Sequence, residues 1–335
     1  MAPLSMLSPA YKLVLGNRIV DTTDEPRASI VTELRVELDL DTPADRFLLV
    51  MGQVGAWRPQ REDEARIELG YMDNGDLTRV MTGTVTSVAP NLTSRRVIGH
   101  SAAMTLLRSF ANRTFENKTA GEIIRDLAGQ AGVPVATAEH GISFPAYVID
   151  SQRSFWHHWR DLADLCGFDL YLNSQGELVF QRFAGGRTVH VLDHGRHILT
   201  LECNFTTVRA PRIEAWGESP TGTEGESAWG WLSKDLSSMR GQAGTGKPTL
   251  LLERPVLRTS QAAQSAADAL HTNTQRRALR GRLTIPGNPA VKLGDAVRVQ
   301  ESPEGELNDT YQVRSIVHRI AKKNGFITTI GFRSI

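Results

Sequence analysis

The glycine-rich run Gly241-Gln-Ala-Gly-Thr-Gly246-Lys247 has the spacing of a phosphate-binding loop as far as its lysine. In such a loop, backbone N–H groups surround the phosphates and a Ser or Thr after the lysine places a hydroxyl on Mg²⁺. Here Pro248 occupies that position, no buried strand precedes the run, and no apolar helix follows it. The pattern therefore favours a glycine loop over a nucleotide site.

Three histidines, His190, His194 and His197, lie close together in the sequence with Asp193 among them. Imidazole and carboxylate groups are good zinc ligands, which makes this group a candidate metal site. The step from His194 to Gly195 is typical of a turn, however, and the spacing matches no helical metal motif. Solvated turn histidines are the favoured interpretation.

A helix predicted from about Ser154 carries His157 and His158. Adjacent helical residues point about 100° apart, so these two rings cannot both face one metal ion. Cys166 lies on the apolar side of the same helix, which indicates a buried, inert thiol. No G-x-S-x-G elbow occurs, and no carboxylate pair has an apolar setting that would raise a pKa. We therefore predict no enzyme, and we assign no catalytic, cofactor-binding or metal-ligating residue.

The charge balance also excludes some partners. The 335 residues are 40% hydrophobic and 22% charged, with a formal net charge of +1, as in an ordinary globular protein. No overall field attracts nucleic acid, so we predict no specific nucleic-acid binding. The basic pairs are each interpreted as solvated edges: Arg95-Arg96, Arg276-Arg277 and Lys322-Lys323.

Cysteine usage and hydropathy point to synthesis in the cytoplasm. Cys166 and Cys203 are the only cysteines, which argues against a disulfide scaffold. The N-terminus lacks the basic start and apolar stretch of a signal peptide. The best apolar run, 47–51, is far too short to span a bilayer, so we predict no membrane anchor.

The elements that position these side chains begin with strands. Apolar and polar residues alternate over 30–40, which places Ile30, Thr32 and Leu34 on one predicted buried face. Alternation continues over 65–71, and a further strand over 77–88 is followed by a return over 96–99. This antiparallel meander predicts a first tube-like β-barrel over residues 1–108.

Residues 109–185 are predicted to form a small α+β domain. Thr119 and Glu122 have the spacing of a capping box, which starts a helix that ends at Gly132. The second helix runs from about Ser154 to Gly167, and a hairpin over 168–180 follows it.

The remaining chain is expected to form a second tube-like β-barrel from residues 186–218 and 280–335, around a loop-rich insertion at 219–279 with one helix near 260–272. The stretch 218–249 is rich in Gly, Ser and Thr, and we expect it to be mobile. Val313 and Val317 are predicted core residues. The fold class is therefore mainly β with an α+β insertion: two tube-like antiparallel β-barrels plus a small α+β domain. A Val-x-Ser hairpin near 85–99 is echoed near 313–331.

Several segments, taken in order, resemble the phage late control protein D family of contractile-tail baseplate hubs. The family is similar to the N-terminal hub part of the spike proteins of type VI and extracellular injection systems. The matching segments cover nearly the whole chain: 82–88, 114–128, 154–168, 176–180, 293–299, 311–315, 318–319 and 325–329.

This resemblance implies a homotrimer whose paired barrels form a pseudo-sixfold ring, with a hexameric tail tube protein above and a trimeric spike below. Other baseplate proteins are further possible partners. Because the chain ends at Ile335, soon after the closing hairpin, the spike is expected to be a separate protein. The chain would be cytoplasmic during assembly and then part of the tail or injection particle. One alternative is a tail-associated cell-wall hydrolase, which a peptidoglycan zymogram would distinguish. Another is a secreted or cytosolic β-rich binding module, a monomer that light scattering after size-exclusion chromatography would separate from a trimeric ring.

Overall fold

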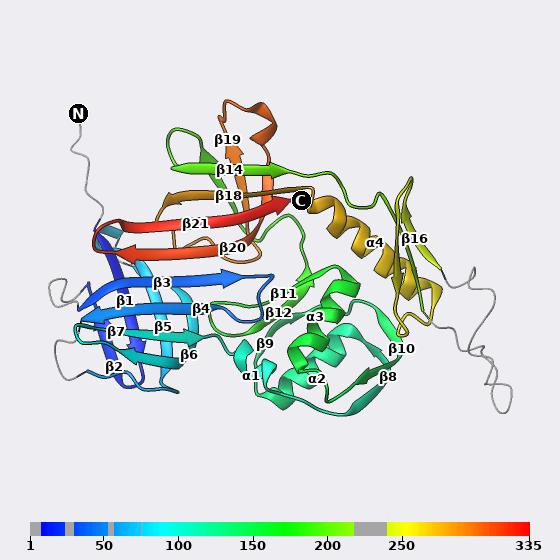
Figure 1. Cartoon of the computed structure of the whole chain (residues 1–335), viewed down its shortest axis with the longest axis horizontal. Coiled ribbons are helices and arrows are strands. Elements are labelled where there is room, and N and C mark those ends of the chain that lie inside the picture. The colour runs from blue at the N-terminus through cyan, green and yellow to red at the C-terminus, as the bar shows by residue number, and fades with distance from the viewer. Residues whose placement is uncertain (1–7, 24–29, 53–56, 75, 218–239) are drawn as a thin grey trace.

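The computed structural model describes residues 8–23, 30–52, 57–74, 76–217 and 240–335 (Figure 1). The predicted class is confirmed, because the chain is mainly β with a few helices. Thirteen strands form one large sheet: β1 Pro9–Leu15, β2 Arg18–Asp21, β3 Val31–Asp39, β4 Arg46–Gly52, β5 Glu64–Tyr71, β6 Thr78–Pro90, β7 Ser94–His100, β13 Val189–Asp193, β14 Thr200–Phe205, β18 Leu279–Pro286, β19 Ala296–Gln300, β20 Thr310–Ala321 and β21 Gly325–Ser334.

The strand order joins the two expected tube-like β-barrels into one continuous sheet. The main path is β14-β18-β21-β20-β3-β4-β7-β6-β5-β1-β2, and β13 and β19 branch from β20. The start of β20 pairs with β19, whereas residues 315–321 pair with β3. The β20–β3 pair therefore joins two halves into one sheet: strands β1–β7, and strands β13, β14 and β18–β21. In the described ranges β2 and β14 each have a single strand neighbour, which leaves the sheet open.

Two β-bulges change which residues face the core. The β3–β4 register shifts between Val31 and Glu33, so Val31 is buried and Thr32 is exposed, opposite to the predicted alternation. The β20–β21 register shifts after Val313, which is fully buried. Val317 is consequently only half-buried, and our prediction of it as a core residue is wrong. A bulge adds one residue to one strand, so every later side chain changes face.

The α+β unit contains α1 Ala103–Leu107, α2 Ala120–Ala131 and α3 Phe155–Cys166. The Thr119–Glu122 capping box is present, and both longer helices end at a left-handed glycine, Gly132 or Gly167. Two small sheets complete the unit: β8 Arg113–Thr119 with β10 Ser143–Ile149, and β11 Phe168–Leu172, β12 Leu178–Arg182 and β9 Val135–Ala138.

A third small sheet extends the α+β unit. It contains β15 Arg212–Trp216, β16 Gly241–Gly244 and β17 Thr249–Glu253, and α4 Ser260–Arg276 packs on it. Residues 212–216, expected in the second barrel, therefore lie outside the large sheet, and residues 241–244, expected in a loop, form a strand. Residues 218–239, the rest of the loop predicted to be mobile, lie outside the described residues. The division of the chain at residues 108, 185 and 279 stays a prediction.

The described residues form two hydrophobic cores. One lies within the large sheet, draws on both of its halves, and includes Tyr171 and Val179 from the α+β unit. The other lies around α2, α3 and α4, and includes Trp159 and Ile213. Each half of the large sheet also carries a hairpin with a bulge at a Val-x-Ser sequence, in β6 and in β20. The partner strands differ in register by one residue, because Ser87 lies opposite Ile98 whereas Ser315 lies opposite Gly331.

Candidate functional site

The glycine-rich run does not have the geometry of a phosphate loop. Gly241 begins β16, and Lys247 is exposed in the turn before β17, so a strand follows the lysine where a phosphate loop has a helix. A Cβ at Gly241 would collide with the backbone of Ala263 in α4. This glycine therefore allows the close packing of β16 on α4.

The histidine group is dispersed by the fold. His190 Nε2 lies 2.9 Å from Oδ2 of Asp295, and the His197 ring accepts the backbone N–H of Asp193 at 3.0 Å. His194 is exposed in the intervening turn. Nowhere in the described part of the chain do three His, Cys, Asp or Glu side chains form a group that could hold a metal ion.

The residues of α3 also have separate environments. His157 is exposed and its Nδ1 lies 2.8 Å from Ser154 Oγ, while His158 is buried with Nε2 3.2 Å from the Asp150 carbonyl. Cys166 is buried, and burial raises the pKa of its thiol to about 12. A thiol with that pKa is not a nucleophile at neutral pH. None of the helices in the described ranges has the length and apolarity needed to cross a membrane.

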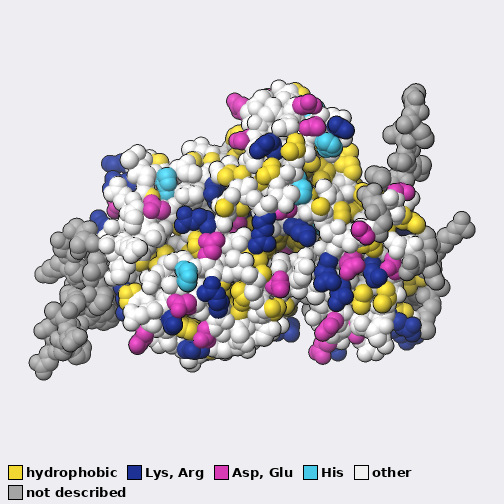
Figure 2. Space-filling view, turned by 180° about the vertical axis from the view of Figure 1, so that it is seen from behind, with side chains coloured by type: hydrophobic (Ala, Val, Ile, Leu, Met, Phe, Trp, Pro, Cys, Tyr) yellow, Lys and Arg dark blue, Asp and Glu magenta, His cyan; other side chains and the backbone are white. Residues whose placement is uncertain are grey.

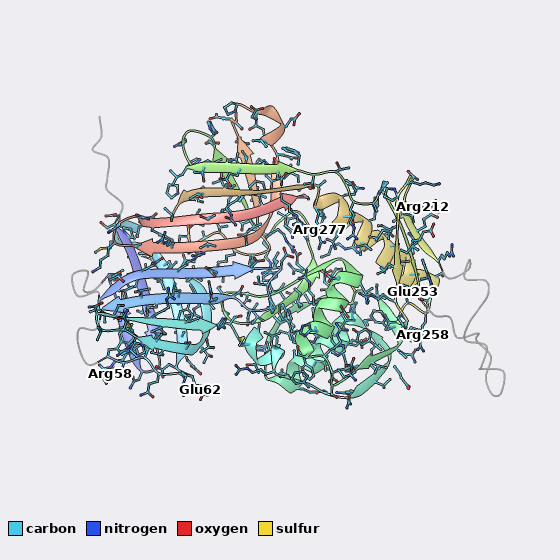
Figure 3. The ribbon with its side chains drawn as sticks, viewed as in Figure 1. Arg58, Glu62, Arg212, Glu253, Arg258 and Arg277 are labelled. Atoms are coloured by element: carbon cyan, nitrogen blue, oxygen red, sulfur yellow. The ribbon has the colours of Figure 1, made fainter. Side chains whose placement is uncertain are left out.

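Sequence reasoning missed a charged cavity of about 850 Å³ at the junction of the large sheet and the α+β unit. Its walls come from β14, β18, β20 and β21 of the sheet, from α3, and from the end of α4, where Arg277 lies beside the sheet (Figure 3). Six arginines and three carboxylates line it: Arg160, Arg277, Arg280, Arg282, Arg314, Arg333, Asp39, Asp41 and Glu202. Arginine is therefore in excess by three charges.

The floor of this cavity includes Arg314 and Arg333, which belong to a hydrogen-bond network that is buried except at Asp41. Arg314 donates to Oδ1 of Asp169 at 2.9 Å and to Oδ1 of Asp41 at 2.5 Å. Gln312 donates to the other Asp169 oxygen at 2.5 Å and accepts from Nε of Arg333 at 2.7 Å. Charge-assisted hydrogen bonds of this kind are stronger than neutral ones, so this hydrogen-bond network holds the large sheet against the α+β unit.

Electrostatics differ between the members of the floor. The protein around Asp41 desolvates its carboxyl, which would raise its pKa, but the guanidinium groups of Arg314 and Arg160 lower that pKa overall. Arg333 has the neutral amide of Gln312 as its hydrogen-bond acceptor. Burial, and then the positive charge of Arg314, lower the pKa of Arg333 to about 9.

The rim consists of Arg277, Arg280 and Arg282, which are exposed and have no ion pair with any described residue. Arg280 lies directly opposite Arg333 in the β18–β21 register. Like charges placed opposite each other across two strands are destabilising. The rim and the adjoining floor therefore form a positive surface that can attract anionic groups.

No family model and no curated protein sequence matches the chain. Solved structures do match it over nearly its full length. The 43 kDa tail protein of prophage MuSo2 from Shewanella oneidensis matches at a TM-score of 0.75 with 16% identity, covering 98% of each chain. A tail protein from Neisseria meningitidis MC58 matches at 0.72 with 12% identity, covering 98% of this chain and 97% of the other.

A third match is the E. coli c3393 protein, described as a type VI secretion component with structural similarity to the T4 tail proteins gp27 and gp5. Its TM-score is 0.63 at 10% identity, over 97% of this chain and 77% of that one. At such identities the similarity shows a shared fold. The chain therefore has the fold of phage tail proteins and of this secretion component.

Proposed function

We propose that this chain is a non-enzymatic structural subunit of a contractile phage tail or injection machine, and specifically its baseplate hub of the late control protein D type. The observation that carries the proposal is the fold shared over nearly the full length with two phage tail proteins, and over 97% of this chain and 77% of the other with a type VI secretion component.

The hub is a homotrimer that adapts a hexameric tail tube to a separate trimeric spike. Two features of the chain support this arrangement. The large sheet has two halves joined through β20 and β3, and each half contains a hairpin with a bulge at a Val-x-Ser sequence. Three chains would then present six similar halves, and closed symmetric rings are the common form of homo-oligomers.

Light scattering after size-exclusion chromatography tests the trimer, and class averages of negatively stained particles test the ring. We expect light scattering to give a mass three times that of the 36.9 kDa chain. A stable trimer of this kind would bury an interface well above ~1,000 Å² per contact. A stable monomer at micromolar concentration, or a ring of another order, would refute the hub proposal. A clearing zone in a peptidoglycan zymogram would favour the hydrolase alternative.

A further inference from the structure

A second charged feature complements the arginine-lined cavity. The loop between β19 and β20, residues 301–309, contains Glu301, Glu304, Glu306 and Asp309 and has no Lys or Arg. All four acidic residues are exposed, and a short 3-10 helix, η4 Gly305–Leu307, shapes the loop. We call residues 301–309 the acidic loop.

The acidic loop does not reach the arginine-lined cavity of its own chain. It lies at the projecting tip beyond β19, whereas Arg277 marks the cavity lower down, beside α4 (Figures 1 and 3). Asp and Glu side chains are visible on that tip in the space-filling view (Figure 2). No ion pair joins the loop's carboxylates to any arginine within the described ranges. Among the described residues, the four carboxylates of the acidic loop and the three rim arginines therefore have no ion pair in the single chain, although Glu202 lies opposite Arg282 across β14 and β18.

The cavity has the size and charge for a loop of this kind. Its volume of about 850 Å³ falls in the range of pockets that enclose drug-sized ligands, and far exceeds the space needed by one small anion. The cavity is lined by the three exposed rim arginines and by two buried ones, Arg314 and Arg333. Arginine binds carboxylates with two parallel hydrogen bonds, so the rim can hold several carboxylates at once.

An incoming carboxylate would also relieve a repulsion within the sheet. Arg280 and Arg333 face each other across β18 and β21, and among the described side chains Arg333 donates to the neutral amide of Gln312. Asn204 on β14 continues the same row on the other side of Arg280, again without a negative charge. A carboxylate above this row would offset part of the positive charge of the two adjacent guanidinium groups, as Asp169 and Asp41 already do for Arg333.

We infer that the arginine-lined cavity receives the acidic loop of a second copy of this chain. The contact is an interface between subunits, in which Glu304 and Glu306 bind the rim residues Arg277 and Arg280. This inference rests on the proposed self-assembly and identifies the surfaces that mediate it. Because exposed charges form the contact, added salt weakens it.

Charge reversal in the full-length chain tests the inference. One variant carries Arg277→Glu and Arg280→Glu, a second carries Glu304→Lys and Glu306→Lys, and a third combines all four changes. By sedimentation velocity, each double variant should associate at least tenfold more weakly than the parent chain, and the combined variant should recover most of the loss. The matched control, Lys322→Glu with Lys323→Glu, reverses two exposed charges elsewhere and should assemble like the parent. Circular dichroism melts verify that each variant is folded.

A second measurement separates this inference from the hub proposal. A fluorescent peptide of residues 300–310 is titrated against the parent chain and against the Arg277→Glu, Arg280→Glu variant, with anisotropy as the readout. Binding to the parent alone supports the inference even if the chain is monomeric, in which case the trimer proposal fails by itself. A trimer that neither reversal weakens overturns the inference and leaves the hub proposal standing. Equal binding of the peptide to both chains also overturns the inference. So does a parent chain that binds duplex DNA and does not bind the peptide.

Discussion

Arg314 donates a hydrogen bond to Asp169 over 2.9 Å, and this pair joins β20 of the large sheet to β11 of the α+β unit. Arg314 is also the residue at which the β20–β21 register shifts, between Val313 and Ser315. Bulges re-aim side chains next to functional surfaces. This bulge therefore explains how a strand of the sheet core supplies a side chain to the α+β unit.

Removing Asp169 should destabilise the junction. Asp169→Ala leaves Arg314 buried with only one carboxylate, so we expect the free energy of unfolding in urea to fall by about 3 kcal/mol, at the lower end for a broken buried pair. The control is Asp161→Ala, which breaks the exposed pair with Arg153 and should cost less than ~1 kcal/mol. Equal losses for the two variants would show that Asp169 has no special role.

The bulge in β20 gives Val313 and Val317 different degrees of burial, so we expect the two positions to respond differently to the same substitution. Val313→Asp buries an unpaired carboxylate and should cost several kcal/mol of a total stability of about 5–15 kcal/mol. Val317→Asp lies on the half-buried face and should cost about 1 kcal/mol. Urea unfolding compares the two variants. In the parent particle system, Val313→Asp should give particles without a tube, and similar effects at both positions would contradict the observed register.

Asp45 should make stability depend on pH. Burial raises the pKa of its carboxyl to about 7, although the backbone N–H of Asp39 donates to it at 3.0 Å. The folded state therefore binds this proton more tightly than the unfolded chain, in which Asp titrates near pH ~4. The stabilisation is complete below about pH 4 and is lost as pH rises through about 7.

Asp45→Asn should remove that dependence while keeping the acceptor for the Asp39 N–H. At about 1.4 kcal/mol per pKa unit, the variant should gain up to ~4 kcal/mol over the parent at pH 8, and nothing at pH 4. Thermal melts across this range measure the gain. Glu116→Gln, at an exposed position outside the acidic loop, is the control and should follow the parent curve. If Asp45→Asn follows it too, Asp45 is not the titrating group.

His157→Ala and Lys247→Ala should leave particle function nearly unchanged, since both side chains are exposed and we assign them no chemistry. A complementation assay in the parent particle system, with Val313→Asp as the non-functional reference, measures this. Loss of function in either alanine variant, with normal folding and normal particles, would reveal a ligand or catalytic site absent from the structural interpretation.

Local features of the sequence were sufficient to predict both longer helices of the α+β unit. The capping box at Thr119 and Glu122, and the glycines at 132 and 167, act within one or two helical turns. The alternation over 65–71 likewise predicted a strand whose apolar face is buried. These signals depend on neighbours in the sequence, and they hold wherever the element is placed.

The sequence could not show where the strand alternation breaks or which distant arginines meet. The bulges near Thr32 and Arg314 depend on how partner strands align, and each one exchanges the buried and exposed faces beyond it. The cavity brings together Arg160 on α3 and Arg333 on β21, which are far apart in the chain and follow no common period. Only the packing of the large sheet against the α+β unit places these charges together, because side-chain contacts between distant segments are decided by the tertiary fold.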